Sequence, residues 1–237
     1  MDSSVTVTCK ACQQESEGKF CRHCGQSLAI KKVTLSYLLH EVFHFFTHVD
    51  RGLGYTLRQL IIAPGFMQRD FLAGNRSRNQ KPFSMYFLSA SVMAVVLYWI
   101  NYVIVHYYHA RVAGEVIFFN KYLVMLLLAV IPLSTLFTYI FFYNSEYGFA
   151  EIGVMQLYTL SIFFLIVMII QFLKFIWPDM ETRNIELPAI LIYNVITFKN
   201  FFHYQRKWKV ILKSIICAGT FFFTVGYIQD IIVDYLN

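Results

Sequence analysis

The stretch FAEIGVMQLYTLSIFFLIVMIIQFLKFIW, residues 149–177, carries only two charged residues, Glu151 near its start and Lys174 near its end. A helix that crosses a bilayer needs about 20 consecutive, mainly apolar residues. The stretch is long enough, and it therefore predicts a transmembrane helix.

Four other apolar segments accompany it, at residues 83–107, 122–143, 187–202 and 210–236. The segment 187–202 is the shortest and is interrupted by Asn194 and Lys199. It is compatible with a tilted span, a re-entrant pair or an interfacial helix. Together the segments predict an all-α polytopic membrane protein with about five transmembrane helices.

Composition supports this class. Of the 237 residues, 57% are hydrophobic and 14% are charged, and the mean hydropathy is +0.52. Soluble domains carry about 25% charged residues. The 24 Phe and 16 Tyr suit lipid-facing surfaces and interfacial belts. Residues 1–30 hold no continuous apolar stretch, so no cleaved signal peptide is expected there.

The net charge of +6 is concentrated at the ends of the apolar segments. One basic cluster precedes the first segment and another separates the fourth from the fifth; they consist of Arg69, Arg76, Arg78 and Lys81, and of Arg206, Lys207, Lys209 and Lys213. Five spans put both clusters on one side, which the positive-inside rule makes cytoplasmic. The N-terminus is then cytoplasmic and the C-terminus lies outside. This clustering favours anionic lipid over nucleic acid as the partner of the basic residues.

Four cysteines precede the membrane segments as two C-x2-C pairs, Cys9 and Cys12, then Cys21 and Cys24. Each pair can place two thiolates on one tight turn, and two such turns complete a tetrahedral zinc site. Four sulfur ligands close the shell, which makes the zinc structural. Two disulfides are the alternative, but nothing resembling a secretory signal accompanies the cysteines. His23, inside the second pair, is expected to be exposed, and Cys217 is expected to be a small core residue.

The chain divides into three parts: a zinc ribbon at residues 1–30, amphipathic interfacial helices with a basic loop at 31–82, and the transmembrane bundle at 83–237. From Thr34 the apolar residues recur at helical spacing. Asp50-Arg51-Gly52 ends that helix, a second runs over 53–63, and a third begins at Pro64-Gly65. We expect these helices to lie in the headgroup layer.

The first of these helices contains His40-Glu41-Val42-Phe43-His44, which matches H-E-x-x-H, and His48 follows one turn later. Such a motif binds catalytic zinc in metalloproteases. However, the histidines form the polar face of an amphipathic helix, and His40 and His48 are about 12 Å apart along a straight helix. We therefore predict a stripe that faces the headgroups or the ribbon, with a second metal site at His40, His44 and His48 as the alternative.

Polar residues inside the spans are open to two interpretations. Asn101, Gln156, Gln171 and Asn194 can be hydrogen-bond glue between helices or can line a translocation path. Lys174 lies near the end of its span and can extend to the interface.

Residues 9–88 resemble an uncharacterised family of bacterial multi-span membrane proteins. The resemblance rests on the double CxxC ending in Cys24-Gly25-Gln26 and on His40-Glu41, His44, His48, Asp50 and Gly52. It continues through Pro64-Gly65, Arg69-Asp70-Phe71-Leu72, Gly74, Arg76 and Lys81-Pro82-Phe83. It implies a location in the bacterial inner membrane and carries no activity with it.

The sequence therefore predicts a non-enzymatic adaptor or scaffold that docks a protein partner through its cytoplasmic zinc ribbon, with homo-oligomerisation open. The alternatives are a small-solute or lipid transport component and a metal-dependent membrane enzyme that uses the HExxH stretch. A cavity shared by Asn101, Gln171 and Asn194 would favour transport. Convergence of His40, His44 and Asp50 would favour the enzyme.

Overall fold

The computed structural model describes residues 6–29, 34, 52–108, 114–177 and 180–236. Its elements, in chain order, are the strands β1 (Val7–Thr8) and β2 (Glu15–Ser16), the helices α2 (Leu53–Ile62), α3 (Phe66–Leu72), α4 (Pro82–Tyr108), α5 (Gly114–Phe141) and α6 (Phe149–Gln171), the short 3₁₀ helix η1 (Phe172–Phe175), and the helices α7 (Arg183–Phe201) and α8 (Lys207–Leu236). The long helices reproduce all five predicted apolar segments. The predicted helix after Thr34 and the histidines His40, His44 and His48 lie outside the described residues.

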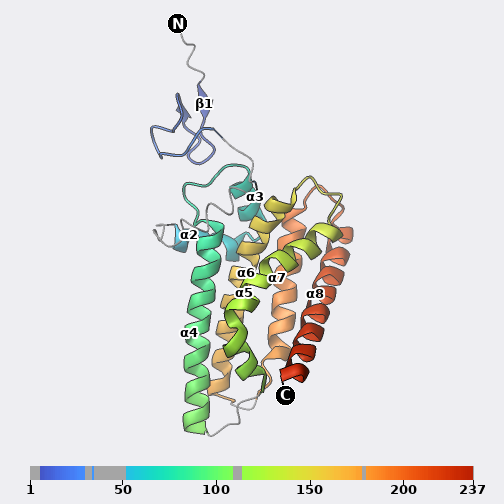
Figure 1. The fold of residues 1–237 in the computed structure, drawn as a ribbon. Helices are drawn as coiled ribbons and strands as arrows, with labels where there is room; N and C mark the ends of the chain where they lie inside the picture. Colours follow the sequence, from blue (N-terminus) through green and yellow to red (C-terminus); the bar gives the residue numbers. More distant parts are fainter. Residues whose placement is uncertain (1–5, 30–33, 35–51, 109–113, 178–179, 237) are drawn as a thin grey trace.

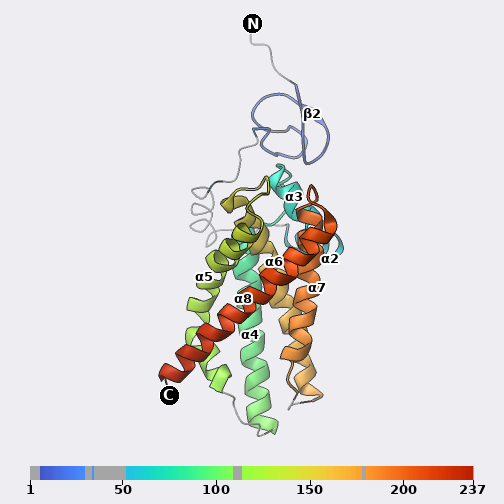
Figure 2. The same cartoon turned by 90° about the vertical axis from the view of Figure 1, so that its right-hand side faces the viewer.

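The five long helices run between the same two ends of the molecule (Figure 1). Helices α4, α6 and α8 begin at the end that carries the β-strands, and α5 and α7 return to it. Seen from the side, α8 crosses the bundle obliquely and finishes at the opposite end (Figure 2). The five long helices of the described residues thus alternate in direction along the chain.

Helix α6 forms the centre of the bundle because it is apolar on every side. Its residues from Ile152 to Ile162 are buried without interruption, and it packs against α3, α4, α5 and α7. A helix that is hydrophobic all round is stable only when neighbours or lipid surround it. Tyr86 of α4 and Phe71 of α3 reach this core, where Phe71 meets Tyr158 edge-to-face at 5.6 Å.

Three helices of the described chain are long and apolar enough to cross a membrane: Pro82–Tyr107, Phe149–Phe175 and Lys207–Tyr227. Leu126–Phe141 within α5 is apolar but shorter. Apolar residues of α4 such as Val95, Tyr98 and Trp99 are exposed, as a lipid-facing surface requires. The protein therefore has the character of a membrane protein, and the count of five spans stays a prediction.

Helices α2 and α3, together called the collar, are amphipathic, and they pack against the bundle. Leu60, Met67 and Phe71 are buried in a cluster with residues of α4 and α6. The hydroxyl of Tyr193 on α7 donates to the carbonyl of Leu60 at 3.1 Å. On the opposite face of the collar, Ile61 and Ile62 remain exposed. The collar is thus fixed in position, and its outer face keeps the apolar side chains that a headgroup layer would receive.

Helix α3 meets the C-terminal turn of α7 at Gly65. The amide of Asn200 donates to the carbonyl of Pro64 at 2.8 Å, and Arg69 donates to the carbonyl of Asn200 at 3.3 Å. The last carbonyls of a helix have no partners within it, so Arg69 satisfies one of them. Gly65 adopts φ +84°, and a Cβ there would lie 2.3 Å from the carbonyl oxygen of Thr197. Only glycine permits this approach.

Candidate metal centre

Two short hairpin-like turns carry the four cysteines. In the first, β1 pairs antiparallel with β2, so that Cys9 and Cys12 lie in the connection. In the second, an isolated bridge joins Phe20 to Ser27 on either side of Cys21 and Cys24. The strand pair and the bridge each close a loop that contains one C-x2-C.

The two turns have the same backbone construction. In each, the N–H of the first cysteine donates to the carbonyl of a glutamine: Cys9 to Gln14 at 2.9 Å, and Cys21 to Gln26 at 2.8 Å. The residue after the second cysteine has positive φ, +61° at Gln13 and +72° at Gly25. The chain thus contains two copies of one pattern: C-x-x-C, then a residue with positive φ, then Gln. This repeat was not predicted from the sequence, although the equal spacing from cysteine to glutamine in both copies indicates it.

The four sulfur atoms converge. All four Sγ atoms lie within 4.8 Å of one another, and the Cys9–Cys24 and Cys12–Cys21 pairs are each 3.6 Å apart. A disulfide would require about 2.05 Å, and all four are free thiols. With Zn–S bonds of about 2.3 Å, a tetrahedral site has S···S edges of about 3.8 Å. The arrangement can hold a metal ion.

Hydrogen bonds favour thiolates at part of the cluster. The Ser16 hydroxyl donates to Sγ of Cys21 at 3.4 Å and, with the backbone N–H groups of Cys24 and His23, lowers the pKa of Cys21 to about 5. The backbone N–H of Gln26 lowers the pKa of Cys24. Burial and the neighbouring thiols outweigh this effect and raise the pKa of Cys24 to about 12. Cysteine binds a metal as the thiolate, so metal binding would release any protons that these thiols carry.

Around the cluster, Cys9 and Cys21 are buried while His23 is exposed. His23 thus lies where the sequence predicts, outside the four-sulfur group. The alternative second metal site at His40, His44 and His48 falls outside the described residues.

The two-turn module contacts the rest of the protein through Gln26. Its side chain is buried, and its Oε1 accepts the backbone N–H of Ser77 at 2.7 Å. Ser77 belongs to the loop between the collar and α4. A residue that closes the second turn therefore also connects the cysteine cluster to the membrane bundle.

The predicted interhelical glue is present at two places. Gln156 on α6 donates to the hydroxyl of Thr138 and, at 3.3 Å, to the carbonyl of Ser134, both on α5. Gln171 donates to Thr182 at 3.0 Å and to the carboxylate of Glu186 at 2.8 Å, which connects the end of α6 to the start of α7. These contacts hold neighbouring helices together, as polar residues in spans do.

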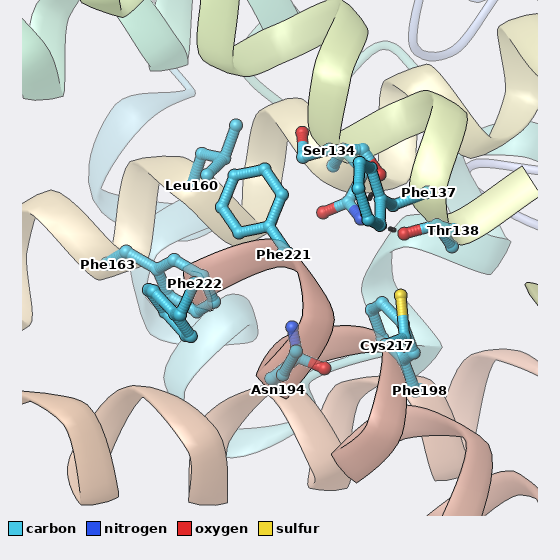
Figure 3. A pocket seen from close by; sticks show the side chains of 12 residues that line it. Ser134, Phe137, Thr138, Leu160, Phe163, Asn194, Phe198, Cys217, Phe221 and Phe222 are labelled. Atoms are coloured by element: carbon cyan, nitrogen blue, oxygen red, sulfur yellow. Dashed lines mark hydrogen bonds between the residues drawn. The ribbon is translucent and has the colours of Figure 1, made fainter. Parts of the chain in front are cut away.

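Asn194 and Gln156 line a small, partly open cavity of about 30 Å³, and Cys217 also belongs to its lining. Aromatic rings of Phe137, Phe163, Phe198, Phe221 and Phe222 surround it (Figure 3). The volume suffices for one or two water molecules, and Oδ1 of Asn194 has no hydrogen-bond partner among the described residues. Neither Asn101 nor Gln171 lines this cavity, so among the described residues it is not the cavity shared by all three that would favour transport.

Comparison with known proteins gives one partial match. A family model described as Protein of unknown function (DUF3667) matches residues 50–94. This range holds the collar, the basic loop and the beginning of α4. No curated protein and no solved structure matches the chain. The matched segment is therefore the one through which the bundle contacts the cysteine module.

Proposed function

We propose that this chain is a non-enzymatic adaptor of the bacterial inner membrane, with a structural zinc ribbon presented on the cytoplasmic side. The observation that carries the proposal is the four-sulfur cluster, held against the bundle by Gln26. Four protein ligands leave a metal no open coordination position for substrate or water. The metal would therefore have a structural role, holding the two turns of the ribbon together so that they present a defined surface.

The ribbon offers such a surface to a protein partner. Phe20 is 63% exposed and lies beside the second turn, and Val7 is also exposed. Exposed aromatic side chains are common energetic centres of protein interfaces. Docking through Phe20 would bring a partner to the membrane surface without further chemistry, and self-association of the chain would be one form of it.

Charge supports the orientation. The loop before α4 lies at the end of the bundle that bears the ribbon (Figure 1), and it contains Arg78 and Lys81. The connection from α7 to α8 lies at the same end and contains Arg206, and Lys207 and Lys209 are in the first turn of α8. The positive-inside rule assigns this end to the cytoplasm. Thiols are kept reduced there, as a cysteine-bound zinc requires.

Elemental analysis of the purified full chain tests the metal. We expect one zinc per chain in the wild type and in Cys217→Ser, a matched control for a buried cysteine outside the cluster. Cys21→Ser should lose the metal yet still insert into the membrane, since apolar length drives insertion. Wild-type protein purified without chelator and free of zinc would overturn the proposal.

Photo-crosslinking in cells tests the adaptor role. A photoreactive amino acid at Phe20 should give a discrete adduct that disappears when Cys21→Ser is added. The same amino acid at the exposed, lipid-facing Val95 serves as the control and should give no such adduct.

A second metal equivalent in the wild type that is lost in His44→Ala would instead favour the enzyme.

A further inference from the structure

A shallow groove of about 590 Å³ lies between the collar and the loop that precedes α4. Gly52 and Tyr55 form one side of it, and Arg76, Arg78 and Lys81 lie along the other. None of the described residues that line the groove is acidic. Three basic side chains therefore surround one depression.

The groove is held in shape by contacts on several sides. The loop passes close to Gly52, where a Cβ would lie 2.6 Å from the carbonyl oxygen of Arg78. Behind it, the backbone N–H of Gln80 donates to the hydroxyl of Thr56 at 2.7 Å, and the hydroxyl of Tyr158 donates to the carbonyl of Gln80. This buried network ties the loop to the collar and to α6.

The basic side chains have different surroundings. Arg76 is oriented by the collar, because its Nε donates to the carbonyl of Phe71 at 3.3 Å and its guanidinium lies over the Phe71 ring at 5.5 Å. Arg78 and Lys81 are exposed. One cation thus lines the wall, and two are accessible to an incoming anion.

The start of α4 adds to the positive potential. Lys81 directly precedes Pro82, the first residue of this 27-residue helix. The first N–H groups of a helix are unpaired and carry the positive end of its dipole, which favours phosphate. Because α4 is a candidate membrane span, the groove lies where the span begins, at the level of lipid headgroups.

We propose that this groove binds the phosphate of an anionic phospholipid headgroup. Arg78 and Lys81 pair with the phosphate oxygens, Arg76 lines the wall, and the phenol of Tyr55 supplies a further donor. Arginine and lysine are the side chains that proteins use for phosphate. The site uses none of the cysteine ligands, so its test is independent of the zinc proposal.

The experiment uses the full chain in a neutral detergent, titrated with a short-chain phosphatidylglycerol, with phosphatidylcholine of equal chain length, and separately with inorganic phosphate. Binding is read from the rise in the apparent melting temperature. The wild type is expected to be stabilised by phosphatidylglycerol and not by phosphatidylcholine, and the effect should weaken with salt.

The diagnostic variant is Arg78→Gln with Lys81→Gln, both exposed and therefore compatible with folding. It should bind phosphatidylglycerol about 30-fold more weakly. Its control is Arg58→Gln with Lys207→Gln, which removes the same charge from exposed positions outside the groove and should bind as the wild type does.

Equal weakening in both double variants, or wild-type affinity in the first, would overturn the proposal. If inorganic phosphate binds with the same dependence on Arg78 and Lys81 while the lipid does not, the phosphate site stands and the lipid as its source is refuted.

Discussion

Replacing Gly65 with alanine tests whether the collar is built onto the bundle. Gly65 has φ +84°, and an added Cβ would lie 2.3 Å from the carbonyl oxygen of Thr197 and 2.8 Å from the backbone nitrogen of Phe201. Both contacts are backbone atoms of α7, which cannot rotate aside as a flexible side chain can. The substitution therefore separates α3 from α7 or forces the local backbone to change.

Two effects set the magnitude. A left-handed conformation costs a non-glycine residue roughly 1–2 kcal/mol, and overpacking a filled site costs about 1–3 kcal/mol. The sum is about 2–5 kcal/mol. For a chain of this size each kcal/mol lowers the melting temperature by about 2–4 °C, so the expected fall is about 4–20 °C.

The assay is the fraction of full-length protein that stays monodisperse after heating in detergent. Gly54→Ala is the matched control, because Gly54 lies within helix α2 and nothing is within 4 Å of its Cβ position. Alanine there should be neutral or stabilising by up to about 1 kcal/mol. If the melting temperature of Gly65→Ala lies within about 2 °C of that of Gly54→Ala, the collar is not packed on α7 as described.

Three other outcomes are expected. Gln26→Ala should speed hydrogen exchange at the Ser77 amide and leave the metal content unchanged. Gln14→Ala, at the equivalent place in the first turn, should leave the exchange of Ser77 as it is in the wild type. Equal exchange rates in the two variants would refute the contact between Gln26 and Ser77. Gln156→Leu should lower the stability by about 1–2 kcal/mol, because its hydrogen bonds to α5 are lost. Asn194→Leu at the same cavity should lower the stability less, because its Oδ1 has no partner among the described residues. Thermal melts compare the two variants. A reporter fused after Asn237 should be found on the membrane side opposite to the N-terminus, and finding both on one side would show that a segment does not span.

The helices were predictable because their signal is local. Apolar length identified each long segment, and Pro64-Gly65 marked the start of α3, which begins at Phe66. Glu151 was expected at the start of α6 and accepts the backbone N–H of Gly148 at 2.9 Å. That α2 and α3 lie in the headgroup layer stays a prediction. Their hydrogen bonds to α7 join residues more than a hundred positions apart, so these contacts had no local signal.

The sequence by itself determined which residues can enter a membrane and which four thiols can meet, because hydrophobic length and C-x2-C spacing are properties of short segments. Only the tertiary structure decided what Gln26, Gly65 and the basic loop do. The approach of Gln26 to Ser77, of Gly65 to Thr197 and of Arg78 to Gly52 each depends on how distant helices pack. Such contacts leave no periodic signal in one chain, so the groove beside the cysteine module emerges only when the elements are assembled.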